Sequence, residues 1–425
     1  MAPHKILMLT NAELGQANVF IATTHSLLEQ DSQVDIHIAS FPSLQKTLNN
    51  ALNGTESSRV TFHPLPGRTM FDCFEAEKDP NDSLMRVSSL KPGFKNTPLA
   101  MKFILTKGLI CWAPDEFAEI FHATCALIKD LNPDLVVVDM LFSPGVTAAK
   151  HLRKNAPNTF KFAILSPNSL KDYIHHLEPK GAVFWKWPIT GSGLPMPIPW
   201  YLIWLNVYLA IRMIWIFIAD KSISIFQDKV REASHLSDLE VCENISMVNG
   251  GLQGVDKVFI GGRPEVEFAY LQYDNPPKEY MSKIVGCGPI LRPIVPIDSE
   301  LEAWLKRGPV IFISLGSHCL TTEEEALDMA RSLKYVIDEA RRKHGSSGSG
   351  NLQVLWKMQK DFTRGPEFGV GAGSAFYTVL GRELDEDRVR IVNWLSSEPN
   401  SILNTGDVIC NISHGGANSF YEAVW

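Results

Sequence analysis

The amino-acid sequence predicts an α/β protein made of two successive domains, and three observations support this prediction. Short apolar runs typical of buried strands alternate with helical patterns through the first half of the chain. The same alternation begins again after about Cys287. The 425 residues also exceed what one hydrophobic core usually holds. We therefore expect a first domain at residues 1–286, a linker at residues 287–300 and a second domain at residues 301–425.

In the first domain the expected strands are continuous apolar runs, which are typical of a parallel sheet covered by helices on both faces. Residues 181–200 are rich in Pro, Gly and Trp, and we expect them to form an irregular loop. The strands are predicted at residues 5–10, 34–39, 135–140 and 161–166, and the helices at residues 17–30, 115–131 and 144–154.

The second domain repeats this pattern after a linker-like segment at residues 288–293. Thr322 and Glu325 form a T-x-x-E capping box, which predicts that a helix begins near Thr322. Residues 345–350 contain only Gly and Ser and predict a flexible loop. Strands are predicted at residues 309–315, 352–356, 390–392 and 408–412.

Composition limits the classes of function. Lys and Arg number 40 and Asp and Glu number 47, so the net charge of −7 argues against a broad nucleic-acid-binding surface. The seven cysteines include no C-x-x-C pair and predict reduced thiols rather than a disulfide framework. The N-terminal segment lacks the apolar core of a signal peptide. We therefore expect a cytoplasmic protein, with membrane association left open by one apolar segment.

That segment spans residues 198–219 and is interrupted only by Pro199, Asn206 and Arg212. About 20 apolar residues suffice for a membrane span, but Arg212 would lie inside it, which is costly. We expect a buried helix, or a helix with an exposed apolar face near a ligand pocket or a membrane surface. A transmembrane helix is the alternative.

The most informative segment is residues 408–425, with the sequence VICNISHGGANSFYEAVW. A predicted strand is followed by a glycine turn and then by a predicted helix. This order makes an anion-binding site, because free backbone N–H groups face outward at the start of a helix. Gly415 and Gly416 let the backbone approach the anion closely, and Asn418 and Ser419 can add hydrogen bonds.

Three further side chains extend this anion site into a nucleotide site. His414 can donate to a phosphate oxygen and share the charge that builds on a leaving diphosphate. Glu422 lies one turn into the helix, where its carboxylate suits a pair of ribose hydroxyls. Trp394 follows the strand at residues 390–392, and its indole can stack on a flat base. The ordered set is far more specific than any of its members.

This set resembles the signature box of the UDP-glycosyltransferases, and most of all the fungal branch of that family (glycosyltransferase family 1). The resemblance spans nearly the whole chain. It implies the GT-B fold, in which two Rossmann-like domains face each other across a cleft. It also implies that Trp394 stacks on uracil, that His414, Asn418 and Ser419 hold the diphosphate, and that Glu422 binds the ribose.

The second domain contains a second motif of the family and one departure from the family pattern. Residues 314–317 resemble the S-x-G-S segment of the family, which implies that Ser317 approaches the donor phosphates. The family pattern continues beyond the position of Trp425 with residues that grip the sugar hydroxyls. On this resemblance we expect the second domain to be incomplete and the chain to be truncated at its C-terminus.

The other departure concerns the catalytic base. The family has a catalytic His in a G-H pair after the first strand, where this sequence has Gly15 and Gln16. An amide cannot take a proton at physiological pH, so Gln16 could orient an acceptor but not deprotonate it. Asp139 matches the Asp that partners the family His, and without that His it could act directly or through water.

The resemblance implies transfer of a hexose, with glucose expected, to a lipophilic small-molecule acceptor with inversion at the anomeric carbon. The UDP-sugar, expected to be UDP-glucose, is a co-substrate, and no cofactor or metal site is expected. The one D-x-D motif, at residues 385–387, lies in a charged run and is interpreted as solvated surface. The aromatic segment at residues 184–204 favours a lipophilic acceptor.

Three other interpretations stay open. A non-catalytic or degenerate sugar-nucleotide-binding protein would account for Gln16. A dinucleotide-dependent oxidoreductase would require a G-x-G-x-x-G motif after the first strand, but Gly15 is the one glycine there. A membrane-anchored protein would be built around residues 198–219.

Overall fold

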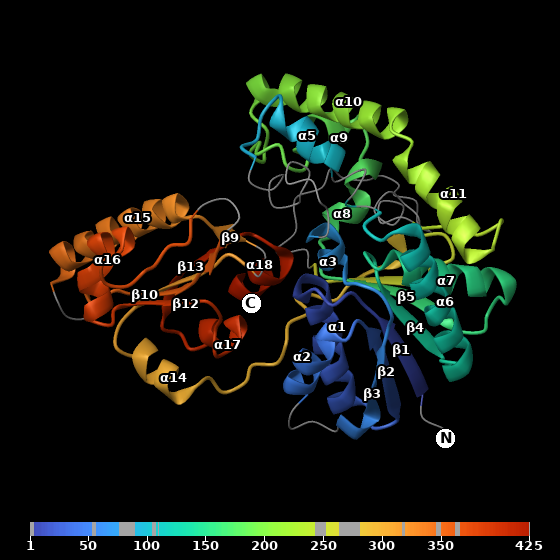
Figure 1. Ribbon diagram of the computed structural model, residues 1–425, viewed down its shortest axis with the longest axis horizontal. Helices are drawn as coiled ribbons and strands as arrows, with labels where there is room; N and C mark the ends of the chain where they lie inside the picture. The colour runs from blue at the N-terminus through green and yellow to red at the C-terminus, as the bar shows by residue number, and fades with distance from the viewer. Residues whose placement is uncertain are drawn as a thin grey trace. The chain divides into compact units, whose positions relative to one another are not determined.

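The chain folds into two compact units, Met1–Ile290 and Leu291–Trp425, each an α/β domain (Figure 1). The division falls inside the segment that the sequence analysis assigns to a linker. The structure, a computed structural model, describes residues 4–52, 57–75, 90–103, 108, 110–242, 252–262, 281–316, 319–345, 350–361 and 366–424.

The first unit is built on a seven-stranded parallel sheet with the order β3-β2-β1-β4-β5-β6-β7. Strand β1 lies between β2 and β4, so the strand order reverses beside it. In such sheets ligands bind outside the carboxyl ends of the strands at this point. The strands are β1 (His4–Leu9), β2 (Val34–Ser40), β3 (Val60–Pro64), β4 (Leu135–Asp139), β5 (Lys161–Ser166), β6 (Lys257–Ile260) and β7 (Ile284–Gly286).

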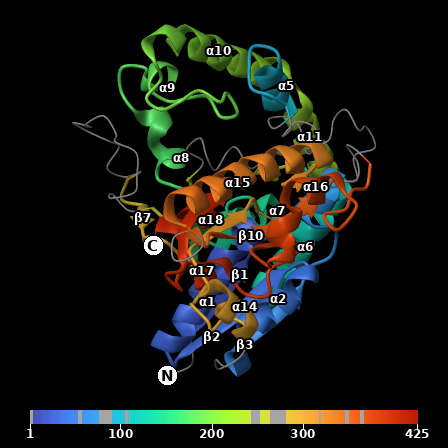
Figure 2. The ribbon, with the colours of Figure 1, turned by 90° about the vertical axis from the view of Figure 1, so that its left-hand side faces the viewer.

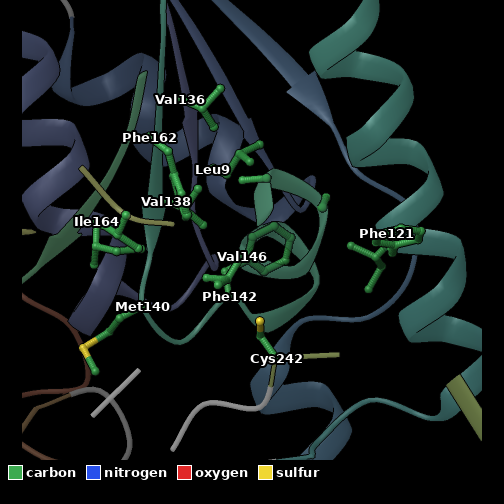
Figure 3. Close-up of a cluster of buried hydrophobic side chains, with 14 of the residues drawn as sticks. Leu9, Phe121, Val136, Val138, Met140, Phe142, Val146, Phe162, Ile164 and Cys242 are labelled. Atoms are coloured by element: carbon green, nitrogen blue, oxygen red, sulfur yellow. The ribbon is translucent and has the colours of Figure 1, made fainter. Parts of the chain in front are cut away.

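Alternate residues of the central strands pack on opposite faces of this sheet. Leu7 and Leu9 lie in one buried cluster with helices α6 (Pro114–Leu131) and α7 (Ser143–Asn155), and Figure 3 shows part of that cluster. Met8 lies in a second cluster with helices α1 (Leu14–Gln30) and α2 (Ser43–Ala51). Because both faces are covered, the strands are continuous apolar runs, as the sequence predicts.

A further group of helices in the first unit connects β3 to β4 and β5 to β6. The segment predicted as a loop at residues 181–200 contains one short helix, α9, so that prediction is correct only in part. The group comprises α3 (Met70–Glu75), α5 (Asn96–Phe103), α8 (Lys171–Ile174), α9 (Ala182–Trp185), α10 (Ile203–Ala219) and α11 (Ser222–Ser234).

Helix α10 is the outermost element of this group, with α5 and α9 beneath it (Figure 1). Only Asn206, Leu209 and Ala210 of this helix are buried, so of the two forms expected the structure shows the helix with an exposed apolar face and not the buried helix. The opposite face exposes large apolar side chains instead. Within the described part of the chain, one helical stretch, Trp200–Ser234, is long and apolar enough to cross a membrane by length and composition.

The second unit has a four-stranded parallel sheet with the order β12-β10-β8-β13 and a two-stranded sheet of β9 and β11. Helices α15 and α16 cover one face of the larger sheet, and α14 and α17 cover the other (Figures 1 and 2). The strands are β8 (Val310–Ser314), β9 (Leu320–Thr321), β10 (Gln353–Lys357), β11 (Gln359–Lys360), β12 (Val389–Val392) and β13 (Val408–Ser413). The helices are α14 (Ser299–Leu305), α15 (Glu323–His344), α16 (Ala375–Asp385), α17 (Pro399–Leu403) and α18 (Ala417–Val424).

The predicted capping box is present at the start of α15. The Thr322 hydroxyl accepts from the Glu325 N–H at 3.4 Å, and the Glu325 carboxylate accepts from the Thr322 N–H at 2.9 Å. The exchange satisfies two backbone donors that have no partner within the helix. Helix α15 therefore begins where the sequence predicts.

Candidate functional site

The second unit places the glycine motif between β13 and α18. Gly415 has a φ of +72°, in the region that favours glycine, and its N–H donates to the Ser413 hydroxyl at 3.3 Å. The Phe420 N–H donates to the Gly416 carbonyl at 2.9 Å and closes the first turn of α18. This helix begins at Ala417, so Asn418 and Ser419 lie within its first turn.

The imidazole of His414 lies against the backbone of two glycines. A Cβ atom at Gly416 would lie 2.3 Å from Nε2 of His414, and a Cβ atom at Gly316 would lie 2.9 Å from its Cε1. Gly316 follows β8, the strand that pairs with β13 in parallel. Burial and the nearby Lys357 ammonium lower the pKa of His414 below its ordinary value of 6.5. His414 is therefore neutral at pH 7 and can donate a hydrogen bond through one ring nitrogen.

Trp394 presents a largely exposed indole beside a half-buried lysine. The Trp394 side chain is 56% exposed, and Nζ of Lys357 lies 3.9 Å from its ring centroid. Lys357 is the last residue of β10, next to β12, and burial lowers its pKa below the ordinary value. The sequence analysis missed Lys357, although a cation at the end of a central strand was the available signal.

Glu422 lies on α18 within the electrostatic reach of several charges. Burial raises its pKa from 4.5 to about 7, Arg292 and Lys357 lower it, and Glu398 raises it. Arg292 pairs with Glu398, the residue that precedes α17. A carboxyl group with a pKa near 7 is a good hydrogen-bond acceptor for hydroxyls only above that pH.

Most of the predicted donor-site residues therefore lie in one strand, turn and helix. His414, Gly415, Gly416, Asn418, Ser419 and Glu422 are continuous along this segment, and Lys357 connects Trp394 with His414 and Glu422. Ser317 lies outside the described residues. The roles of all these residues stay predictions.

In the first unit, Asp139 is the last residue of β4 and is completely buried. Its Oδ2 accepts from the Asn11 side chain at 3.0 Å and from the Asn11 N–H at 3.4 Å, and its Oδ1 accepts from the Leu141 N–H at 2.9 Å. Burial raises the pKa of Asp139 from 3.8 to about 7 despite these hydrogen bonds. Both oxygens face protein donors, so Asp139 ties the end of β4 to the segment that follows β1.

Gln16 lies in the first turn of α1, and the structure draws attention to its neighbour Glu13. Oε1 of Gln16 and Oε2 of Glu13 are both buried and have no hydrogen-bond partner among the described residues. The other oxygen of Glu13 accepts from the Phe71 N–H at 2.7 Å. Burial raises the pKa of Glu13. The sequence analysis missed Glu13, although it is the one acidic residue between β1 and α1.

The D-x-D motif lies among surface ion pairs. Asp387 pairs with Arg307 at 2.6 Å and with Arg390 at 2.8 Å, and Glu386 pairs with Arg382 at 2.8 Å. In the parts of the chain that the structure describes, no group of three or more His, Cys, Asp or Glu side chains could hold a metal ion.

Comparison with known proteins defines the class to which this fold and site belong. Phytolacca americana UGT2 was solved with UDP-2-fluoro-glucose and pterostilbene. It is similar to this chain with a TM-score of 0.53 and 15% sequence identity, and the likeness covers 100% of this chain and 78% of the UGT2 chain. Medicago truncatula UGT71G1, solved with UDP-glucose, has a TM-score of 0.52 and 12% identity, with the same coverage. These likenesses show that the fold is the GT-B fold.

Sequence comparison narrows the class. The chain is 28% identical over 434 aligned residues to the glycosyltransferase sdnJ of Sordaria araneosa, covering 99% of this chain and 77% of the relative. No family model matches the chain. The chain is thus a glycosyltransferase with the GT-B fold, and that fold is the one found in solved UDP-glycosyltransferases. The interpretation as a dinucleotide-dependent oxidoreductase is set aside.

Proposed function

We propose that this glycosyltransferase transfers a hexose, glucose in the first place, from UDP-hexose to a lipophilic small-molecule acceptor with inversion. One observation carries the donor part of this proposal. His414 lies against Gly316 and Gly416 at the point where β13 turns into α18. The imidazole and the N-terminal end of α18 therefore meet at one place, and this arrangement suits a diphosphate.

The remaining donor contacts follow from the positions of the neighbouring side chains. Asn418 and Ser419, in the first turn of α18, add polar groups beside the diphosphate. Glu422 lies one turn further on and would accept from the two ribose hydroxyls. Trp394 would stack on uracil, because its indole is exposed. Neutral His414 would donate to a phosphate oxygen and stabilise the charge of the departing UDP.

A single displacement accounts for the proposed stereochemistry. The acceptor oxygen forms a bond to the anomeric carbon on the face opposite UDP, and the bond from that carbon to the diphosphate oxygen breaks. The electron pair leaves with UDP, and the acceptor hydroxyl loses its proton. One displacement of this kind inverts the anomeric configuration. The lipophilic nature of the acceptor is supported by the aromatic segment around α9, and the P. americana enzyme was solved with pterostilbene.

The thermal shift with UDP tests the donor site. We expect UDP to raise the melting temperature of the wild-type chain, because a ligand that binds only the folded state stabilises it. His414→Ala should lose most of this rise, whereas His344→Ala, at the end of α15, should keep it. A folded wild-type chain without a shift, or an equal shift in His414→Ala, would contradict the proposed site. Release of UDP from UDP-glucose, UDP-galactose and UDP-xylose with a panel of phenols then tests the sugar.

For location, we propose a cytoplasmic enzyme that docks on the surface of a lipid membrane through the outer face of α10. Trp200, Trp204 and Trp215 are 83%, 58% and 64% exposed. Tryptophan is enriched at the level of lipid headgroups, where its ring is partly apolar and partly polar. Arg212 and Lys221 are also exposed along this stretch and would face anionic headgroups.

The inner face of α10 favours surface docking over a membrane span. The side chain of Asn206 accepts from the Ile189 N–H at 2.9 Å and donates to the carbonyls of Phe184 and Trp187 at 2.8 and 2.9 Å. These hydrogen bonds hold α10 along the first unit, and a span would have to break them in an apolar medium.

Sedimentation with vesicles tests the docking. We expect the chain to pellet with phosphatidylcholine vesicles that contain phosphatidylserine, and a Trp215→Glu, Ile218→Glu variant to stay in the supernatant. Tyr335→Glu is the matched control, because Tyr335 is equally exposed on α15. Equal pelleting of the α10 variant would contradict the proposal. A wild-type dimer that this variant dissociates would assign the same face to a second copy of the chain instead.

A further inference from the structure

The proposed transfer requires a group that takes the proton of the acceptor hydroxyl, and of the two predicted catalytic residues only Asp139 is a candidate for this role. Gln16 carries an amide, which does not accept a proton at physiological pH. Asp139 is completely buried, and its two oxygens accept hydrogen bonds from Asn11 and Leu141. An acceptor could reach Asp139 only by displacing these bonds.

Glu13 has the geometry that Asp139 lacks. It precedes α1, but its carboxylate does not cap that helix; Oε1 accepts from the Phe71 N–H at the start of α3 instead. Oε2 is buried and has no hydrogen-bond partner among the residues that the structure describes. One oxygen therefore anchors the carboxylate, and the other has no hydrogen-bond donor among the described residues. A buried acceptor in this state calls for a ligand or an ordered water.

Three residues near Glu13 in the sequence also carry a buried oxygen without a hydrogen-bond donor among the described residues. Oδ1 of Asn11, Oε1 of Gln16 and Oδ1 of Asn18 are also buried without a hydrogen-bond partner in the described residues. These oxygens follow the carboxyl end of β1, beside which the strand order reverses. This is the position at which open α/β sheets bind ligands. A hydroxyl-bearing molecule would bring the donors that these oxygens lack.

The charges around Glu13 favour proton uptake. Burial raises the pKa of Glu13, the Phe71 N–H and the Thr69 side chain oppose this, and Asp72 on α3 raises it further. Asp139 on β4 and the thiols Cys73 and Cys111 also interact electrostatically with Glu13. A base whose pKa moves from 4.5 towards neutrality takes a proton more readily at physiological pH.

We propose that Glu13 is the general base of the transfer reaction, and this inference rests on the function proposed above. The acceptor hydroxyl gives its proton to Oε2 of Glu13 while its oxygen bonds to the anomeric carbon. The bond from that carbon to the diphosphate breaks, UDP leaves with the electron pair, and Glu13 then releases the proton to solvent. Asp139 is a positioning residue, because it holds the Asn11 end of the same segment.

Kinetics of Glu13→Gln test the proposal, with Glu29→Gln on α1 as the matched control. With UDP-glucose and 4-methoxyphenol, kcat of Glu13→Gln should fall by about 100- to 10,000-fold, the usual contribution of a general base. With the more acidic 4-nitrophenol, which is partly ionised at neutral pH, the loss should be much smaller. The KM for UDP-glucose should stay unchanged, and the acidic limb of the kcat profile should disappear.

Two kinetic results would overturn the proposal. One is a Glu13→Gln variant that keeps wild-type kcat with 4-methoxyphenol. The other is a variant set in which Asp139→Asn alone removes the acidic limb of the profile while Glu13→Gln retains it. Equal losses with both phenols would also count against a base, because a structural defect does not depend on the acidity of the acceptor.

A binding experiment separates failure of this inference from failure of the proposed function. A wild-type chain that transfers glucose to neither phenol contradicts the function proposed with these probes. Glu13 is then judged by fluorescence titration with 4-methoxyphenol and with its methyl ether, 1,4-dimethoxybenzene. A hydrogen bond to a carboxylate predicts a preference of roughly tenfold or more for the phenol, which Glu13→Ala should lose. An equal preference in wild type and Glu13→Ala would overturn the inference.

Discussion

Most of the candidate donor site of the second unit lies in one continuous segment, whereas the candidate acceptor site of the first unit does not. The donor residues 414–422 form one strand end, one turn and one helix. The acceptor site combines Glu13 after β1 with Phe71 on α3 and Asp139 on β4. A diphosphate needs mainly backbone N–H groups, which a single helix supplies. Proton transfer needs a carboxylate with a particular burial, and burial depends on segments from different parts of the chain.

The largest difference between the two sites should appear in stability. Asp139→Ala leaves the side-chain N–H of Asn11 and the backbone N–H of Leu141 without their acceptor, at about 1–3 kcal/mol each, so we expect the free energy of unfolding to fall by about 2–6 kcal/mol. Glu422→Ala should change it by less than about 1 kcal/mol, since the structure shows no hydrogen bond from Glu422 to any described residue. Urea unfolding followed by fluorescence measures the free energy of unfolding of both variants. Equal losses of stability would contradict the distinction between Asp139 as a structural carboxyl and Glu422 as a ligand-facing carboxyl.

The next largest effect concerns the glycine beside His414. A Cβ at position 416 would lie 2.3 Å from Nε2 of His414, so Gly416→Ala must displace the imidazole. We expect UDP affinity to fall roughly 10- to 150-fold, as in His414→Ala, which corresponds to about 1.5–3 kcal/mol. Gly371→Ala is the control, because a Cβ there meets no atom within 4 Å. In calorimetry the variant that combines Gly416→Ala with His414→Ala should lose no more UDP affinity than either single variant. Additive losses of affinity would mean that Gly416 acts independently of His414.

A smaller loss is expected from removing the indole. Trp394→Ala should weaken UDP binding about tenfold, within the range of about 1–3 kcal/mol for stacking of a base on an aromatic ring. Binding of pyrophosphate, which has no base, should stay unchanged. Parallel titrations with the two ligands measure this. If pyrophosphate loses as much affinity as UDP, Trp394 supports the fold of the site rather than the base.

The smallest expected effect is a pH dependence of ligand binding, and it distinguishes Glu422 from Asp139, the two carboxyls with a pKa of about 7. Glu422 is protonated below that pH and then stops accepting from both ribose hydroxyls. We expect uridine affinity to fall by up to about tenfold between pH 8 and pH 6, at most tenfold per pH unit below the pKa. Uridine carries no phosphate that titrates in this range. Glu422→Gln should remove the pH dependence of uridine affinity, and Asp139→Asn should leave it unchanged. The reverse result would mean that Asp139, and not Glu422, faces the ligand.

The fold was predictable where burial is uniform. The runs that became β1, β4 and β5 are apolar except at their ends, and β2 is interrupted only by Asp35 and His37, because helices cover both faces of the sheet. Strand β3, Val60–Pro64, has the sequence VTFHP and is only partly buried at the sheet edge, so its pattern is weak. The sequence of α10 shows strong hydrophobicity but not which surface covers it, and of the two forms expected there the structure shows the helix with an exposed apolar face.

The candidate site was predictable to the extent that it is local. Residues from His414 to Glu422 stand in a fixed order, so a motif suffices to find them. Lys357 and Glu13 come from other segments, and their relevance depends on a ring 3.9 Å away and on a buried oxygen without a partner. No local pattern encodes either property, and only the folded chain reveals them.

The ammonium of Lys357 over Trp394 has a consequence for the order of events in nucleotide binding. One face of the indole already has a partner before any base arrives. A uracil that stacks on this face must exchange places with the cation, and the freed ammonium then lies beside a ligand rich in negative charge. In nucleotide binding, uracil would thus replace the Lys357 ammonium on the Trp394 ring. The association rate constant, more than the final affinity, would then depend on the strength of the contact between Lys357 and Trp394.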